Sequence, residues 1–290
     1  MENTQTKGHL AAFVTILFWG TTFISTKVLL QDFQPVEILF FRFTMGLIAL
    51  FIVNPRRLKG TTAKQELMFA GAGIFGITLY YLFENIALTY TSASNVGVIT
   101  TTAPFFTAIL AFLFLKDEKK GIGFFIGFVL AIAGVFLISF NGASLELDPK
   151  GDLLALIAAL TWGFYSILMK RITGFGYPTL LVTRRVFLYG LIFMIPALIL
   201  FDFRLGPERF LDPVNVGNLL FLGLGASAMC FVTWNYSVKI LGAVKTSVYI
   251  YLTPVITVAM AFVILHEPIT PLLILGTVLT LLGLVVSQRK

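Results

Sequence analysis

Apolar segments of about twenty residues follow one another along nearly the whole chain, and this pattern limits the fold most strongly. A helix needs roughly 20 apolar residues to cross a bilayer, whereas the strands of a membrane barrel would appear as short alternating segments. The chain is 58% hydrophobic and 12% charged, compared with about 45–50% and about 25% in soluble domains. We therefore predict an all-α membrane protein with ten transmembrane helices, at residues 10–30, 35–53, 67–90, 94–115, 121–140, 152–171, 179–201, 215–239, 244–265 and 270–287.

Residues of the first two predicted helices recur in the sixth and seventh. Five identities share one displacement of 143 positions: Trp19, Gly20, Lys27, Pro35 and Arg42 match Trp162, Gly163, Lys170, Pro178 and Arg185. A second series is displaced by 150 positions and includes Asn85, Ala93 and Pro104, which match Asn235, Ala243 and Pro254. Because five spans fall in each half, we predict two repeated units, at residues 1–145 and 146–290.

Basic residues in the connections predict how the chain is oriented. With the N-terminus in the cytoplasm, thirteen lysines and arginines fall in the inner tails and connections, whereas Lys150, Arg204 and Arg209 fall outside. The positive-inside rule then puts both termini in the cytoplasm. Since five is an odd number of spans, the second unit enters the membrane from the opposite face, which predicts an inverted repeat. Secondary transporters commonly have such repeats, with the substrate site near the midplane between the halves.

Composition excludes several other classes of protein. Cys230 is the only cysteine, so an internal disulfide cannot form, and His9 and His266 alone cannot build a metal centre. The net charge of +7 arises from basic residues in short connections, which indicates membrane topology rather than nucleic-acid binding. No G-x-x-x-x-G-K-S/T phosphate-binding motif occurs, and the first apolar segment lacks a signal-peptide cleavage site. We expect no metal, no cofactor, no nucleic-acid partner and no removable signal peptide.

The ordered motifs of both halves resemble those of a known family. A Trp-Gly pair in the first span is followed by Lys, Pro and Arg, then by Asn-x-Ala-Leu at residues 85–88 and by Pro104. This set resembles the drug/metabolite transporter superfamily, and within it the EamA-type transporters, which have two five-helix units. In the second half, Asn235-Tyr-Ser-Val departs from the pattern. The resemblance implies transport by alternating access without ATP, mostly export or exchange of amino acids, other metabolites or drugs.

Glu84 is a charged residue deep in the third predicted span. A charge at this depth is costly and usually faces a partner or a watery cavity. Tyr81, Glu84 and Asn85 share one helical face, since they are three and four residues apart. The carboxyl either couples transport to protons or binds a substrate amine, or it forms a structural ion pair with Lys27, Lys245 or an arginine.

Aromatic and hydroxyl side chains form stripes at helical spacing in the middle of several spans. Trp19 and Trp162 lie far from the interfacial belts that tryptophan prefers, and Trp234 takes the repeat position of Glu84. The stripes could be packing contacts between helices or could line an aromatic-walled cavity. On the second interpretation the candidate substrate-binding residues are Trp19, Thr22, Tyr81, Glu84, Asn85, Trp162, Tyr165, Trp234, Asn235 and Tyr249.

Arginines in the second and seventh spans are candidates for the frame of the protein or for its site. Arg42 and Arg185 are repeated, which favours a structural role, with binding of a substrate carboxylate as the alternative. Arg184 matches Phe41 of the first half and so has no basic counterpart there. We therefore regard Arg184 as a candidate charge partner, and as the more substrate-specific of the two neighbouring arginines. Lys245 could likewise meet an anionic substrate or could snorkel to the interface.

Two prolines inside spans predict breaks in the helical hydrogen bonding. Pro104 and Pro254 each leave the carbonyl four residues earlier, at Thr100 and Ile250, without its usual partner. Either site could be a gate hinge or a static bend. Small residues on the fifth and tenth spans indicate close helix packing, and a dimer contact is the alternative, so we expect a monomer or a homodimer.

These observations predict a secondary transporter rather than an enzyme. We expect it to move an amino acid or related solute by export or exchange across a prokaryotic cytoplasmic membrane. Its partners would be the bilayer, the small-molecule substrate and the proton as coupling ion. A membrane-embedded lipid-modifying enzyme would gather His, Asp or Glu at one interface, and a non-transporting helical bundle would need no duplication. Both remain as alternatives.

Overall fold

The computed structural model describes residues 2–115, 122–139 and 149–287. Within these ranges the regular structure consists of helices, without strands, and this confirms the predicted all-α class. Eight helices of the described chain are long and apolar enough to span a membrane, and Pro271–Gly283 is a shorter apolar helix. The ten spans and the inversion of the repeat remain predictions.

The first half contains two long helices followed by two interrupted ones. The interruptions are a π-helical segment in the third span and a 3-10 turn in the fourth. The elements are α1 (Glu2–Leu29), α2 (Pro35–Val53), α3 (Ala63–Gly73), η1 (Ile74–Leu79), α4 (Tyr80–Tyr90), α5 (Ala93–Ile99), η2 (Thr100–Thr102), α6 (Ala103–Leu115) and α7 (Ile122–Ser139).

The second half has the same order of continuous and interrupted helices, with two additional segments, the short turn η3 and the π-helical segment η6. Its elements are α8 (Pro149–Thr173), α9 (Thr179–Leu200), η3 (Pro207–Leu211), α10 (Pro213–Leu220), η4 (Phe221–Met229), α11 (Cys230–Leu241), α12 (Ala243–Ser247), η5 (Val248–Leu252), α13 (Thr253–Met260), η6 (Ala261–Leu265) and α14 (Pro271–Ser287).

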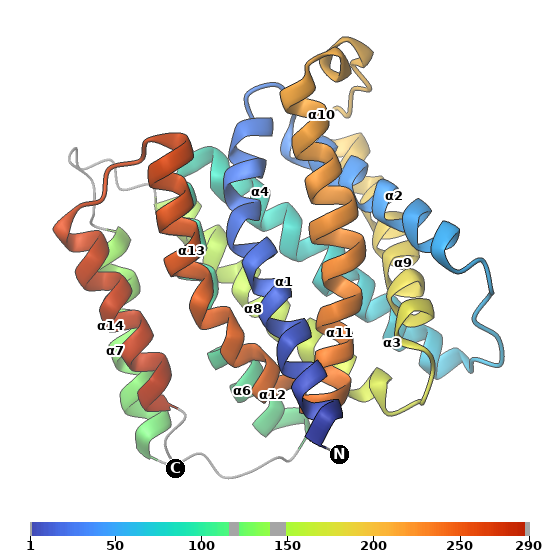
Figure 1. Cartoon of the computed structure of the whole chain (residues 1–290), viewed down its shortest axis with the longest axis horizontal. Coiled ribbons are helices and arrows are strands. Elements are labelled where there is room, and N and C mark those ends of the chain that lie inside the picture. The colour runs from blue at the N-terminus through green and yellow to red at the C-terminus, as the bar shows by residue number, and fades with distance from the viewer. Residues whose placement is uncertain (1, 116–121, 140–148, 288–290) are drawn as a thin grey trace.

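The helices form one bundle whose two sides are built differently (Figure 1). α7 and α14 stand together as a pair at one side, whereas α2 and α9 lie at the other, and α1 and α8 run between them. α1 begins and α14 ends at the same end of the bundle (Figure 1). The largest group of buried apolar residues lies in the central region, where α1, α2, α8, α9 and α11 meet.

The helix breaks at the two intramembrane prolines are resolved locally by the backbone. Pro104 cannot donate to the Thr100 carbonyl, and this carbonyl instead accepts from the amide of Ala103. At the second break, the Thr253 amide donates to the Ile250 carbonyl in the same way. A tight 3-10 turn thus supplies the partner that the proline removes, so these bends need no buried unsatisfied carbonyl.

Glycines let α7 and α14 approach until their backbones touch. A methyl group added at Gly134 would lie 2.5 Å from the Gly276 carbonyl oxygen, and one at Gly283 would lie 2.5 Å from the Gly127 carbonyl oxygen. Backbone atoms cannot move aside as a flexible side chain can. Close approach of this kind gives membrane helices their van der Waals contact.

Gly283→Ala should therefore destabilise the protein. Overpacking of a close contact costs about 1–3 kcal/mol, so the apparent unfolding temperature in detergent should fall. Gly217→Ala on α10 is the matched control, because nothing lies within 4 Å of a methyl group there. The close-packing account is contradicted if both variants unfold at the temperature of the unaltered protein.

Candidate functional site

Three tryptophans from distant parts of the chain meet in the centre of the bundle. The ring centroids of Trp19 on α1 and Trp162 on α8 are 5.2 Å apart, with the rings nearly perpendicular. Trp234 on α11 lies 5.0 Å from Trp19 and 6.1 Å from Trp162. Perpendicular and tilted rings are the favoured arrangement for aromatic pairs. This cluster joins the two halves of the chain around one point.

A cavity lies beside the tryptophan cluster. Its volume is about 40 Å³, which holds roughly three water molecules. Pockets for organic ligands are usually about 300–1,000 Å³, so this conformation is too narrow for a metabolite. The walls come from both halves: Ile16, Trp19, Thr22, Phe23, Tyr80, Tyr81, Glu84, Thr100, Ala103, Trp162, Ile250 and Thr253.

The cavity wall carries a hydrogen-bond acceptor and a donor that the protein leaves unused. Glu84 is 1% exposed, and its Oε1 atom has no hydrogen-bond partner among the described residues. The indole N–H of Trp162 is likewise buried without a partner in this part of the chain. Buried polar groups are normally satisfied, and an exception calls for a water, an ion or a ligand. The polar neighbours of the Glu84 carboxyl include Arg42 and the Tyr80 hydroxyl.

Arg42 is completely buried behind the cavity wall. Its Nε atom donates to Ser227 Oγ at 3.0 Å, and its guanidinium lies over the Tyr81 ring, 4.3 Å from the centroid. Both of its terminal nitrogens lack a hydrogen-bond partner within the described residues. A buried arginine and a buried glutamate therefore lie in the same region without a direct ion pair, an arrangement that is costly unless something compensates it.

Five of the ten candidate substrate-binding residues line this cavity: Trp19, Thr22, Tyr81, Glu84 and Trp162. The structure thus brings together residues from the first, third and sixth predicted spans.

Three further candidates lie behind the wall: Trp234 and Tyr165 pack against the tryptophans, and Asn235 bonds to Tyr165. The Tyr165 hydroxyl donates to Asn235 Oδ1 at 2.8 Å, and Asn235 Nδ2 donates to Thr183 Oγ1 at 2.9 Å. These groups use their hydrogen bonds within the protein, so they hold the helices around the cavity.

The remaining two candidates lie away from the cavity. Asn85 Nδ2 donates to the Pro35 carbonyl at 3.0 Å and so joins α4 to the start of α2. The Tyr249 hydroxyl lies 2.7 Å from Nδ1 of His9, a contact between η5 and the first turns of α1. In both contacts a side chain extends from one helix to an element that is distant in sequence.

The two lysines that were candidate partners of Glu84 do not contact it. Lys27 Nζ donates to the carbonyls of Leu88 at 2.5 Å and Thr91 at 2.8 Å, where it caps the end of α4. Lys245 is exposed on α12. The structure therefore contains neither of the lysine ion pairs that one interpretation of Glu84 predicted.

The two candidate arginines of α9 also have other partners. Arg184 donates from both terminal nitrogens to the carbonyls of Asn54 and Arg56, in the connection that follows α2. Arg185 pairs with Glu66, with Nη2 and Oε1 3.2 Å apart. Neither arginine lines the central cavity.

Sequence reasoning missed Tyr80 as a wall residue. Its ring centroid lies 5.0 Å from that of Trp162. A signal was available, since Tyr80 precedes Glu84 by four residues and therefore shares its helical face. Thr100, Ile250 and Thr253 enter the wall where the 3-10 turns expose them, a geometry that hydropathy does not indicate.

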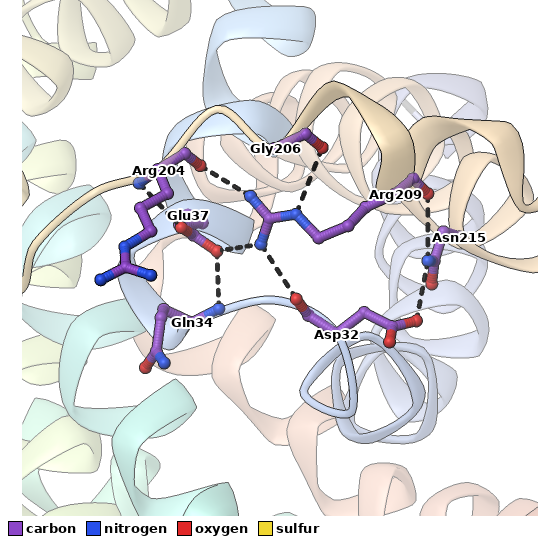
Figure 2. A network of polar contacts seen from close by, with 7 residues as sticks. All are labelled: Asp32, Gln34, Glu37, Arg204, Gly206, Arg209 and Asn215. Carbon is purple, nitrogen blue, oxygen red and sulfur yellow. Dashed lines mark hydrogen bonds and ion pairs between the residues drawn. The ribbon is translucent and has the colours of Figure 1, made fainter.

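A network of polar contacts ties the two halves together at the end of the bundle where α1 stops (Figure 2). Arg209, from the connection between α9 and α10, donates to Glu37 Oε2 at 2.6 Å and to the Asp32 carbonyl at 2.9 Å. Glu37 Oε1 accepts from the Arg204 amide at 2.9 Å, and Asn215 Nδ2 donates to Asp32 Oδ2 at 2.9 Å. Glu37 is 1% exposed, so this carboxylate depends on its partners.

The helices and the central cavity define an integral, multi-pass membrane protein with an aromatic-walled, partly polar site in its centre. The chain belongs to the EamA-like transporter family, whose sequence profile matches residues 6–140 and 149–288. This confirms the resemblance in the motifs.

Relatives from archaea and bacteria match the chain over nearly its whole length. A protein of Archaeoglobus fulgidus, named as an uncharacterized transporter, is 30% identical over 99% of both chains. The uncharacterized transporter YyaM of Bacillus subtilis is 28% identical over 97% of this chain and 94% of its own. A protein of Streptantibioticus cattleyicolor, named "Probable terminal-alkyne amino-acid exporter", is 26% identical over 98% of this chain and 94% of its own.

A solved crystal structure has the same fold. It matches with a TM-score of 0.71 at 20% sequence identity and covers 98% of this chain and 96% of its own.

Glu37→Gln should weaken the network in Figure 2 and lower stability. The change removes the charge opposite Arg209, and breaking such a pair costs about 2–3 kcal/mol, which corresponds to a fall of roughly 5 °C in apparent unfolding temperature. Glu208→Gln is the control, because it removes the same charge from an exposed position of the same connection. Equal unfolding temperatures of the two variants would contradict the role given to Glu37.

Proposed function

We propose that this protein is a secondary transporter that moves a small organic metabolite by alternating access through the central cavity. One observation carries the proposal. The wall of a cavity between the two halves contains a buried carboxyl oxygen and an indole N–H without protein partners among the described residues. A passing solute can supply both contacts, and no dedicated cofactor is needed.

Reciprocal packing supports an inverted repeat. A methyl group at Gly20 would meet the Ile256 side chain at 2.6 Å, and one at its repeat counterpart Gly163 would meet Phe106 Cβ at 3.1 Å. Ile256 and Phe106 are themselves related by the displacement of 150 positions. α1 thus packs on α13 as α8 packs on α6, which a pseudo-two-fold axis between the halves explains.

The pair formed by α7 and α14 has the same reciprocity. Gly134 approaches the Gly276 carbonyl, while Gly283 approaches the Gly127 carbonyl, and the two contacts exchange under the displacement of 149 positions. The π-helical segments η1 and η4 also overlap at equivalent positions of the two halves. These relations support ten spans in two inverted five-helix units, at residues 1–145 and 146–290.

We propose that both termini face the cytoplasm of a prokaryotic cell. Support comes from the excess of basic residues in the predicted inner connections and from the beginning of α1 and the end of α14 at one end of the bundle (Figure 1). Several of the counted cations, among them Lys116 and Arg289, lie outside the described residues. The bacterial and archaeal relatives agree with a prokaryotic membrane.

The substrate class that fits the site best is an amino acid or a related amine-bearing solute. The unpartnered Glu84 oxygen suits an ammonium group, the aromatic walls suit its apolar part, and cations bind the faces of tryptophan and tyrosine rings. The name of the Streptantibioticus cattleyicolor relative, an amino-acid exporter, points to the same class. Transport requires the cavity to widen, and the breaks before Pro104 and Pro254 lie in its wall, at Thr100 and Ile250.

Counterflow in proteoliposomes tests the transport function and the role of Glu84 together. Liposomes that contain the protein and are loaded with an unlabelled amino acid or amine should take up the labelled form of that solute. An imposed proton gradient should increase its accumulation. Glu84→Gln should lower gradient-driven transport about tenfold or more, since a hydrogen bond to a charged group contributes about 1.5–3 kcal/mol.

Glu208→Gln is the matched control, and it should transport as the unaltered protein does. Absence of counterflow across a broad metabolite panel, with the protein folded, would contradict the transport function. Unaltered gradient-driven transport by folded Glu84→Gln would contradict the role of the carboxyl.

A further inference from the structure

A second, strongly basic pocket lies apart from the central cavity, where α2 ends and α9 begins. Its volume is about 440 Å³, and its lining includes Arg57, Arg184, Arg185, Phe51 and Leu188. The two pockets share no lining residue. α2 and α9 lie at the side of the bundle opposite α7 and α14 (Figure 1), so this pocket is at the edge of the protein, away from the transport site.

We propose that this pocket binds the phosphate-bearing headgroup of an anionic phospholipid. Among the residues that the structure describes, three guanidinium groups line it and no lining residue is acidic. Arginine suits phosphate because its planar fork donates two parallel hydrogen bonds to phosphate oxygens. Basic pockets between transmembrane helices are known to bind anionic headgroups.

Contacts of Arg184 fix the position of the connection that follows α2 and contains Arg56 and Arg57. Arg184 is 5% exposed, stacks over Phe51 with its guanidinium carbon 4.1 Å from the ring centroid, and donates to the carbonyls of Asn54 and Arg56. These bonds hold the connection after α2 against α9. They place the next residue, the exposed Arg57, at the pocket, and no described residue occupies its donors.

The positive charge of the pocket is only partly compensated by the protein. Glu66 pairs with Arg185 at 3.2 Å and also accepts from the Tyr189 and Thr61 hydroxyls. The Nε atom of Arg185 is nevertheless buried without a partner among the described residues. Among the described residues, one of the three guanidinium groups therefore pairs with a carboxylate, which leaves a net positive site for a phosphate.

The apolar surroundings favour a lipid over a free anion. The last turn of α2 exposes Ile52 at 78% and Val53 at 71%, and α9 exposes Ile192 and Ile195 at 47% and 51%. Acyl chains can lie along these side chains while the headgroup occupies the pocket at the helix ends, which is the depth of the membrane interface. In the proposed orientation this is the inner leaflet.

Thermal unfolding of the purified full-length chain in neutral detergent tests the proposal without any transport measurement. Phosphatidylglycerol should raise the apparent unfolding temperature saturably, by roughly 5 °C at a hundredfold excess over Kd. Phosphatidylcholine with the same acyl chains should give little change. Arg57→Gln should increase the half-maximal phosphatidylglycerol concentration about tenfold, because it removes a charge-assisted contact.

Arg204→Gln is the matched control and should respond as the unaltered protein does, since its guanidinium points away from the network in Figure 2 and does not line the pocket. Equal shifts with the two lipids, or an unaltered response of Arg57→Gln, would overturn the proposal. An equal shift with glycerol phosphate or inorganic phosphate alone would indicate a free-anion site and would also overturn it.

Discussion

The burial of Glu84 and Arg42 in the centre of the bundle is the physical constraint on which the proposed site depends. Both side chains are at most 1% exposed, and each leaves polar atoms without hydrogen-bond partners among the described residues. Such groups cost free energy in a dry interior unless they are compensated. A bundle that served stability alone would pair them or replace them with apolar residues. Their presence in the region of the cavity is the physical basis for proposing a solute or proton site there.

The proposed mechanism requires the helices around this centre to move, and their contacts indicate where they are held and where they can bend. The 3-10 turns before Pro104 and Pro254 satisfy the backbone locally, so the helix can bend there without exposing carbonyls to lipid. Glycine contacts fix α7 against α14 at one side, and the Glu37–Arg209 network joins the halves at one end (Figure 2). The central cavity is narrow and lies between firmly held elements. In the proposed mechanism this is a closed conformation, and the cavity must widen before a metabolite enters.

Hydropathy predicts the helical class, because it depends on local sequence. The repeated residues predict that Trp19 and Trp162 lie in one region, because an inverted repeat puts equivalent mid-span residues near the midplane. Hydropathy also indicates Glu84, since a charge in the middle of a span stands out. The partners of Arg184, Lys27 and Tyr249 could not be predicted in this way. Each depends on how far a side chain reaches to a carbonyl or ring on an element distant in sequence. The wall residues Ile250 and Thr253 depend on the 3-10 geometry of a helix break.

Access to the central cavity from the two faces of the membrane tests the proposed mechanism most directly. Cys230 is buried, and its replacement by Ala leaves a background in which Thr22→Cys puts a single thiol in the cavity wall. A membrane-impermeant thiol reagent is applied separately to right-side-out and inside-out vesicles. Alternating access predicts labelling from either face, with protection by the transported solute. Labelling from one face alone, or from neither, would contradict it.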